Sequence, residues 1–460
     1  MDRFRKSRKV YLSAGDCGKI MLWQVKKILH CHFPELSARL SALSDPRIGP
    51  QYTIEELVMA SIVLFLLKCD SRNDFNHKCK DDQFRSNYRR MFRLKLPQMD
   101  AVNDLFEKME TSQMEELRCC FINSLIEKRV FHRLRFFDKF FYFAIDGTGV
   151  YHWSDTPVES ILHHALRKES KTGKVSYSNQ IVEAALVCSN GMTIPLMTEW
   201  VANNGADCQT QDCELNAFKR LCGRLKKSFP RLKVCILVDG LYTNVSMMEI
   251  CKQSDWGYVT VFKDGNLSSV WEEVNSLLPI KDASESCRQQ VGDSTHWITR
   301  NYRWIKDLEY QKHKFNWMEC VQERLHRETK EKSETRFVFL TNLDVNRLNI
   351  ADILMAARAR WQIEDHFNTQ KNRGGSLHHK YNRNDFKAMK NWHSVRQLAC
   401  MMTEFVKYTL ELQQLKKDNA KMTWKELWKR LNSFLIMCIV DEAIDEFETW
   451  SLQPRQVRLE

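Results

Sequence analysis

Hydrophobic positions recur with helical spacing at both ends of the chain and with strand-like spacing in its middle. An apolar helix is predicted to begin at Thr53, where Glu56 three residues later completes the pattern of a capping box. Two more helices are predicted after Pro97, and residues 76–96 are interpreted as a basic linker that leads to them. Helical spacing returns from residue 388 onward, so helices are expected to flank a central region of different character.

The central region alternates short apolar runs with helical segments. Two strand-like runs, "QIVEAALVC" and "MTIPLMTEW", are joined by Ser-Asn-Gly, which is typical of a hairpin turn. The run "FFYFAID" precedes them, and after them come a helix, the strand "KVCILVDG", a second helix and the strand "GYVTVFK". This order predicts an α/β layer built on a mixed sheet, in which three antiparallel strands are followed by parallel crossover connections.

Residues 265–336 alternate aromatic or aliphatic residues with polar and basic ones, as half-buried strands do. We therefore predict an α/β fold whose mixed sheet is interrupted by a β-rich insertion, with helical regions at both ends. The predicted boundaries are a helical region at 1–135, the first part of the α/β core at 136–264, the insertion at 265–336, the second part of the core at 337–385 and a helical region at 386–460.

The charge of the chain favours an anionic partner. Lysine and arginine number 70 against 58 acidic residues, which gives a net charge of +12, and basic stretches lie at 83–95 and 373–384. The anionic partner of a basic protein is most often nucleic acid, although many basic proteins bind none. No apolar run reaches the roughly 20 residues that a membrane-spanning helix requires, and the first residues lack the apolar segment of a secretory signal. We expect no membrane partner.

The 16 cysteines are scattered, and no two of them are spaced as C-x-x-C. Several lie inside apolar stretches, so we expect reduced and mostly buried thiols rather than a disulfide framework or a zinc site. Thiols of this kind are typical of a cytoplasmic protein.

Three acidic residues stand where chemistry is expected. Asp146 and Asp239 each follow an apolar strand and precede a glycine, and Glu364 shares one stripe of a predicted helix with Arg360 and Lys371. Each acid alone has an ordinary explanation, because Asp-Gly often begins a turn and an i,i+4 ion pair stabilises an exposed helix. If the two strands are neighbours in the sheet, however, the three carboxylates converge at one edge.

Converging carboxylates repel one another unless cations lie between them. Their hard oxygen ligands suit Mg²⁺ or Mn²⁺, and two such ions about 3.5–4 Å apart support in-line phosphoryl transfer. We therefore predict that Asp146, Asp239 and Glu364 are catalytic and bind two divalent ions. Arg360 and Lys371 are predicted to contact the phosphates of a bound strand.

These motifs, taken in order, resemble those of the DDE transposases of the bacterial insertion-sequence family four, which have a ribonuclease-H-like catalytic core. That family has an Asp after the first core strand, Asp-Gly after the fourth, and a helical signature of Tyr, two residues, Arg, three residues, Glu, six residues and Lys. The strand-rich insertion is also similar, whereas the signature tyrosine falls on Ala357. The matching residues are Asp146 in "FAIDGTG", Asp239 in "ILVDGLYTN", and Arg360, Glu364 and Lys371 at the family's spacing.

The resemblance implies DNA transposition, a form of DNA recombination. The enzyme would nick the ends of a mobile element and transfer the 3′-hydroxyls into target DNA. Its partner would be double-stranded DNA, held by the N-terminal helical region and by a homodimer assembled on the DNA, in the cytoplasm. Two alternatives remain open. A domesticated transposase-derived protein would bind DNA without cutting it, and a nuclease or junction-processing enzyme would use the same core without transposition.

Several further residues are candidates for DNA contact. Trp297 and Trp304 lie among basic and aromatic residues of the insertion, where each would stack on a base or instead join the core. Arg373 begins a basic, glycine-containing loop that would contact DNA or remain solvated. His366 is close to Glu364 in sequence but points away from it on a helix, so a structural role is predicted.

Overall fold

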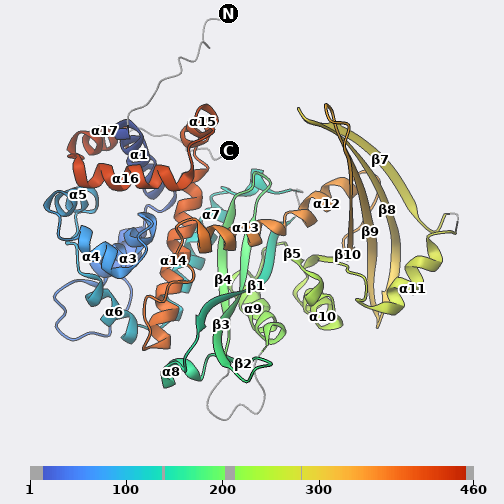
Figure 1. Cartoon of the computed structure of the whole chain (residues 1–460), viewed down its shortest axis with the longest axis horizontal. Helices are drawn as coiled ribbons and strands as arrows, with labels where there is room; N and C mark the ends of the chain where they lie inside the picture. The colour runs from blue at the N-terminus through green and yellow to red at the C-terminus, as the bar shows by residue number, and fades with distance from the viewer. Residues whose placement is uncertain (1–13, 137–139, 203–212, 281, 452–460) are drawn as a thin grey trace, which may run out of the picture.

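Helices from both ends of the chain pack together into one body, seen on the left of Figure 1. The computed structural model describes residues 14–136, 140–202, 213–280 and 282–451. Helix α14 packs against α3 and α6, and α16 packs against α1. The helices of this body are α1 (Ala14–His32), α2 (Leu36–Ser41), α3 (Ile54–Leu66), α4 (Arg72–Lys78), α5 (Asp82–Phe92), α6 (Met99–Lys108), α7 (Ser112–Glu127), α14 (Phe386–Lys407), α15 (Leu410–Asp418), α16 (Trp424–Met437) and α17 (Asp441–Ser451).

Local sequence explains why two of these segments form helices. Helix α3 begins as predicted, because the Thr53 side chain accepts a hydrogen bond from the Glu56 amide while the Glu56 side chain accepts one from the Thr53 amide. The prediction of a linker at 76–96 was wrong, because this segment contains α5. Phe84 and Tyr88 bury one face of α5, and its basic residues lie on the other face of an amphipathic helix.

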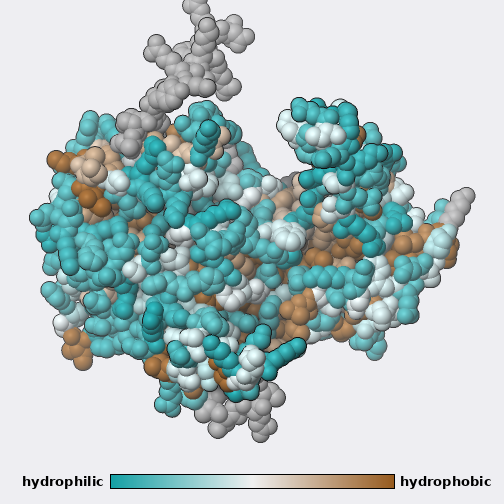
Figure 2. Space-filling model, in the orientation of Figure 1, coloured by the Kyte–Doolittle hydropathy of each residue, from teal (hydrophilic) through white to brown (hydrophobic). Residues whose placement is uncertain are grey.

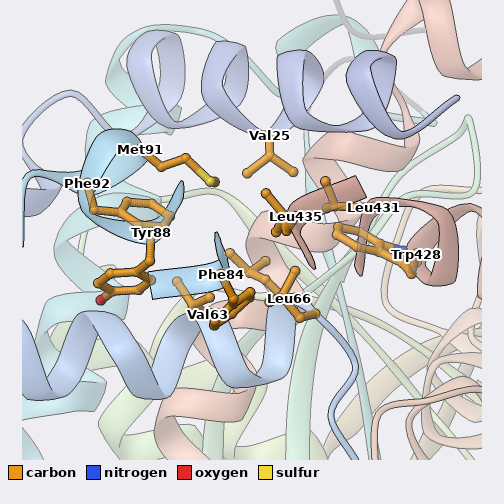
Figure 3. A pocket seen from close by; sticks show the side chains of 11 residues that line it. Val25, Val63, Leu66, Phe84, Tyr88, Met91, Phe92, Trp428, Leu431 and Leu435 are labelled. Carbon is orange, nitrogen blue, oxygen red and sulfur yellow. The ribbon is translucent and has the colours of Figure 1, made fainter. Parts of the chain in front are cut away.

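A small apolar cavity lies where α1, α3, α5 and α16 meet (Figure 3). Its volume is about 20 Å³, and its lining includes Val25, Leu66, Tyr88 and Leu435. Cavities lined by apolar side chains stay dry. This cavity is therefore a small gap in the packing of the helical body and not a site for a polar ligand.

Within the described ranges, ten strands form one mixed sheet in the order β2-β3-β1-β5-β6-β10-β9-β8-β7, with β4 paired to β3. Strands β1, β3 and β4 pair antiparallel, whereas β1 with β5 and β5 with β6 pair parallel. The predicted α/β class and mixed sheet are therefore confirmed. The strands are β1 (Phe141–Trp153), β2 (Leu166–Glu169), β3 (Val175–Val187), β4 (Thr193–Val201), β5 (Val234–Val238), β6 (Gly257–Val261), β7 (Glu285–Gly292), β8 (His296–Tyr310), β9 (His313–His326) and β10 (Lys332–Thr341).

Helices cover both faces of the sheet (Figure 1). Phe143 and Ile145 of β1 belong to the same core as α9, whereas Tyr142 and Ala144 pack with α12 and α13 on the opposite face. Since side chains alternate along a strand, Asp146 points to the α13 face. The connecting helices are η1 (His132–Leu134), α8 (Glu159–Leu162), α9 (Glu214–Ser228), η2 (Gly240–Tyr242), α10 (Val245–Ser254), α11 (Ser268–Leu277), α12 (Ile350–Arg358) and α13 (Trp361–Asn372).

The insertion strands continue the core sheet. Strand β10 pairs antiparallel with β6 on one side and with β9 on the other, so β7 to β10 lengthen the sheet in one direction. Helix α11 adds a helical segment at the start of the predicted insertion. The insertion therefore shares a continuous backbone hydrogen-bond network with the strands that carry the predicted acids.

The cysteines within the described ranges are free, and most of them are buried, including Cys188 and Cys235. In the same ranges, no helix has the length and apolar character needed to cross a membrane.

Candidate active site

The parallel pairing of β1 and β5 brings Asp146 and Asp239 to the same end of the sheet. This pairing runs as far as Ala144 opposite Leu237, and Asp239 directly follows β5. Strand β1 does not stop at Asp146 as predicted, because its antiparallel pairing with β3 continues to Trp153. The two aspartates still lie at corresponding positions just beyond the parallel pairing.

Glu364 reaches this end of the sheet from α13, and Arg360 links it to Asp146. The Arg360 guanidinium places Nη1 3.5 Å from Asp146 Oδ2 and Nη2 2.6 Å from Glu364 Oε1. Arg360 is 6% exposed. The stripe predicted to face phosphates is therefore turned inward at Arg360, where the cation is already paired with two acids.

The three acids influence one another electrostatically. Burial raises the pKa of Asp146 to about 6, against the opposing effects of Arg360 and of the Gly147 amide, and repulsion by Glu364 and Asp239 adds to the rise. When the pKa of a carboxyl group is raised in this way, any additional positive charge next to it stabilises the ionised form. Perturbed carboxyl groups of this kind are common in active sites.

The other predicted residues near this site have contacts of their own. The Lys263 ammonium lies 3.3 Å from Asp239 Oδ2. Lys371 donates a hydrogen bond to Thr148 Oγ1 at 2.6 Å, and burial lowers the pKa of Lys371 while Asp146 opposes that effect. Arg373 is exposed directly after α13. Lys371 thus stays beside the acids, whereas Arg373 lies on the surface beyond them.

The oxygen donors of Asp146, Asp239 and Glu364 are those that Mg²⁺ and Mn²⁺ prefer. Among the residues that the structure describes, no three carboxylate, imidazole or thiol side chains are already gathered as a metal site. The cations that form ion pairs with these acids are the Arg360 guanidinium and the Lys263 ammonium. The donor set therefore fits divalent ions in its chemistry, and metal binding would replace contacts that these two side chains now make.

A fourth acid, Glu214 at the start of α9, lies beside the site and was missed in the sequence. Its carboxylate accepts a hydrogen bond from the Tyr242 hydroxyl at 2.5 Å. A Cβ atom at Gly147 would overlap the Glu214 carboxylate, so only glycine permits this approach. The glycine directly after Asp146 was the one sequence signal for this close contact.

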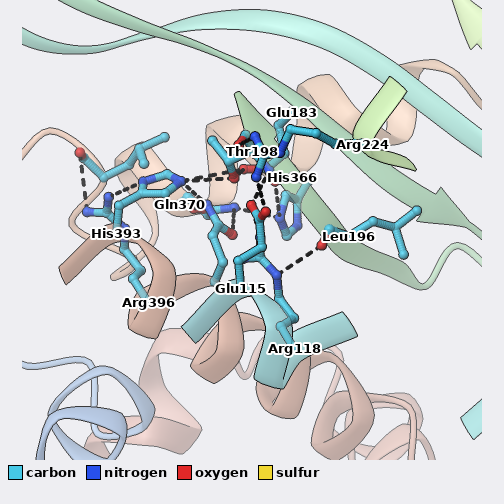
Figure 4. Close-up of polar contacts among 12 residues, drawn as sticks. Glu115, Arg118, Glu183, Leu196, Thr198, Arg224, His366, Gln370, His393 and Arg396 are labelled. Atoms are coloured by element: carbon cyan, nitrogen blue, oxygen red, sulfur yellow. Dashed lines mark hydrogen bonds and ion pairs between the residues drawn. The ribbon is translucent and has the colours of Figure 1, made fainter. Parts of the chain in front are cut away.

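A buried polar network lies under α13 and α14 (Figure 4). Glu183 stands opposite Asp146 in the register of β1 and β3 and is fully buried. Its carboxylate oxygens lie 3.7 Å from His366 Nε2 and 3.8 Å from His393 Nε2. Burial raises the pKa of Glu183 to about 7 and lowers that of His366 to about 4. His366 is thus part of the support beneath α13, in keeping with its predicted structural role.

The two tryptophans predicted to contact DNA lie in different surroundings. Trp304 is 1% exposed and belongs to the core, which corrects its prediction as a DNA contact. Trp297 is 56% exposed, and the Arg327 guanidinium lies 4.2 Å from its ring centroid. The two residues are an odd number of positions apart on β8, so they project from opposite faces of the strand.

We expect Trp304→Ala to lower the free energy of unfolding by about 3–5 kcal/mol, because it leaves a large cavity in the core. Trp297→Ala is expected to change it by less than about 1 kcal/mol, since the ring is largely solvated. Urea unfolding of both variants measures the difference, and Trp304→Phe serves as a milder core control. Equal effects at the two positions would contradict this assignment.

Three arginines form a further polar group between α12 and the insertion strands β8 and β9. Arg300 and Arg358 each donate a hydrogen bond to Gln322 Oε1 at 3.2 Å, and Arg324 lies two residues further along β9. In the described part of the chain, no carboxylate lies within ion-pair distance of any of the three. Burial lowers the pKa of Arg358, and the positive charges of Arg300 and Arg324 lower it further.

Arg300 and Arg358 line a pocket of about 420 Å³, which we call the arginine pocket. It lies between α12 and strands β8 to β10, and its walls include Phe337 and Trp361, whose side chain is 62% exposed. Figure 2 shows the surface hollowed between the helical body and the upper end of the insertion. Cations without acidic partners beside an aromatic wall are suited to binding an anion with an apolar part.

Comparison of the chain with known protein families and with curated proteins finds no match in either.

Proposed function

We propose that the protein is a DNA transposase that acts by metal-assisted phosphoryl transfer. The observation that supports this most directly is that Asp146, Asp239 and Glu364 are close enough to affect the pKa of Asp146. Two of these acids come from neighbouring parallel strands and the third from a later helix. The order of strand, antiparallel pair and parallel crossovers also agrees with the ribonuclease-H-like core that the sequence resemblance implies. The proposed reactions are nicking at the ends of an element and strand transfer.

Asp146, Asp239 and Glu364 would hold two Mg²⁺ or Mn²⁺ ions. When bound, these ions would supply the positive charge that activates an attacking oxygen and stabilises a leaving oxygen. Asp146 is largely ionised at about pH 8, well above its pKa of about 6, and is then available as a ligand. Until ions bind, Arg360 pairs with Asp146 and Glu364 and keeps the two carboxylates together. Lys371, held by Thr148, would place a cation near the phosphate that reacts.

Double-stranded DNA is the proposed partner, as transposon ends and as target, bound by a homodimer. The arginine pocket supports this proposal, because Arg358 lies two residues from Arg360 along the chain, and neither Arg358 nor Arg300 has an acidic partner among the described residues. Contacts to phosphates position a duplex on a protein without reading its sequence. The net charge of +12 agrees with a polyanionic partner.

We expect duplex DNA affinity to fall by at least about tenfold between 50 and 200 mM salt, because each phosphate contact releases counterions. Fluorescence anisotropy with a labelled duplex measures this response, and incubation of the duplex that flanks the coding region with Mg²⁺ tests for nicking. EDTA is the matched control for the cleavage reaction. An affinity that does not change with salt would contradict the DNA assignment.

A DNA-binding protein without cleavage activity is the second candidate, and one observation favours it. Ala357 occupies the position of the signature tyrosine, and it is 3% exposed on the buried face of α12. This position offers no aromatic contact to DNA. Tight binding of the flanking duplex with no Mg²⁺-dependent product would favour this candidate over the transposase.

A further inference from the structure

A larger hollow lies on the side of α13 that faces away from the acids. It is bounded by α13, α14, α15 and α16 and has a volume of about 910 Å³; we call it the basic groove. Asp365 and Thr369 of α13 and Arg373 directly after it line the groove, whereas Glu364 and Lys371 do not. On a helix with 3.6 residues per turn, these two sets project in opposite directions. The volume lies in the range of about 300–1,000 Å³ that is usual for ligand sites.

The lining of the basic groove carries an excess of positive charge. Glu404 is already neutralised by Lys407, whose ammonium lies 2.5 Å from it. The remaining cations outnumber the remaining acid, so the groove attracts anions. The charged side chains that line it are the cations Lys68, Arg373, Lys407, Lys416 and Lys425 and the acids Asp365 and Glu404.

Lys68 gives the most specific sign of an anionic ligand. Its ammonium donates a hydrogen bond to Thr403 Oγ1 at 3.2 Å, and within the described ranges no carboxylate lies at ion-pair distance from it. Burial lowers the pKa of Lys68 to about 8. Burying an ammonium group without a counter-ion is unfavourable. A phosphate in the groove would supply the missing negative charge.

Aromatic side chains lie among these cations. Trp361 is 62% exposed at the rim, and Tyr408 and Trp424 contribute further ring surface. The Lys416 ammonium lies 5.8 Å from the Trp424 ring centroid. Basic grooves that also present aromatic rings are typical of sites for unpaired nucleic acid, because free bases stack on the rings while the cations meet the backbone. In a duplex the bases are already stacked on one another, so their faces are not available to these rings.

Trp361 connects the basic groove to the rest of the site. It lines both the basic groove and the arginine pocket, and it is next to Arg360, which holds Asp146 and Glu364. A strand that leaves the acids can therefore pass over the start of α13 and remain in contact with cations on both sides.

We infer that the basic groove binds an unpaired DNA strand of a few nucleotides that leads away from the acidic site. This inference rests on the proposed function only in naming DNA as the source of the strand. Lys68 and Arg373 would contact its phosphates, and Trp361 and Trp424 would stack on its bases. The groove thus gives the protein a second nucleic-acid site, separate from the surface that meets duplex DNA.

The test is the affinity of the full chain for a labelled thymidine oligonucleotide of about 15 nucleotides, measured by fluorescence anisotropy without divalent ions. The double variant Arg373→Glu, Lys425→Glu is expected to bind at least about tenfold more weakly than the wild type. The matched control is Lys417→Glu, Lys429→Glu, which makes the same charge change at exposed lysines of α15 and α16 outside the groove. The control is expected to lose less than about twofold.

Photocrosslinking gives a second measurement that does not depend on charge. An oligonucleotide that carries 5-iodouracil should crosslink to peptides containing Trp361, Tyr408 or Trp424. Equal losses in the two double variants, crosslinks confined to other peptides, or equal displacement by a polyglutamate peptide of the same charge would each overturn the inference. If the wild type cleaves no DNA but the groove variant alone loses the oligonucleotide, the proposed function fails and the groove assignment stands. If the wild type cleaves DNA but both variants bind the oligonucleotide equally, the proposed function stands and the groove assignment fails.

Discussion

Glu364→Gln is expected to lower Mg²⁺-dependent DNA cleavage by about a thousandfold or more, because an amide replaces an anionic ligand and metal-ion stabilisation is worth several kcal/mol. Duplex binding should stay within about threefold of the wild type, since one negative charge fewer reduces the repulsion of the DNA. The glutamine oxygen can still accept the hydrogen bond that Glu364 now takes from Arg360 at 2.6 Å, so the helix keeps its place. Cleavage and anisotropy assays on the same preparation separate the two effects.

The matched control for this variant is Glu272→Gln, which removes an exposed carboxylate on α11. It should cut and bind as the wild type does. Normal cleavage by Glu364→Gln would show that the Arg360–Glu364 pair is only a stabilising ion pair of α13, and the catalytic assignment of this helix would then be withdrawn.

Arg360→Met is expected to destabilise the protein most at alkaline pH. Asp146 has a pKa of about 6 in the folded chain against a usual value of 3.8, so it binds its proton more tightly when folded. The contribution of Asp146 to the free energy of unfolding is therefore fully present below about pH 4, and it is lost as the pH rises through 6. Arg360 holds the folded pKa down, so its removal raises that pKa further and enlarges the loss. Breaking a buried ion pair costs about 3–5 kcal/mol, and we expect a loss of this size near pH 8.

Urea unfolding at about pH 5 and pH 8 measures this dependence on pH. Adding Asp146→Asn to the Arg360→Met variant removes the titrating group and should restore most of the stability at pH 8. A loss of equal size at both pH values, with no recovery in the double variant, would assign the effect to packing of the arginine side chain and not to charge.

The sheet was predictable because its signals are local. The Ser-Asn-Gly turn joins β3 and β4, and the apolar runs before Asp146 and Asp239 became neighbouring parallel strands. The contacts within the site were not predictable, since they depend on residues far apart in the chain. Arg360 meets Asp146, and Glu214 approaches Gly147, only after the sheet and its helices have packed.

The sequence also could not predict which face of a strand would be buried. The alternation of apolar and polar residues showed that the side chains of β8 would lie on two faces of the sheet. It did not show which face would be buried. Trp304 lies on the face that shares a buried core with residues of α12, whereas Trp297 is exposed. The basic groove was equally hidden from the sequence, because Lys68 and Thr403 are 335 residues apart and meet only when the two ends of the chain form one body.

Strand β10 has a practical consequence for anyone who wishes to re-engineer this chain. It is bonded to β6 on one side and to β9 on the other, so excision of the insertion would leave an unprotected sheet edge that invites aggregation. Addition at the exposed turn between β8 and β9 is different. Gln311 and Lys312 form the turn between β8 and β9 with φ of 47° and 66°, outside the paired residues. A fluorophore or fusion partner placed at this turn would report on the insertion without breaking the ladder beneath it.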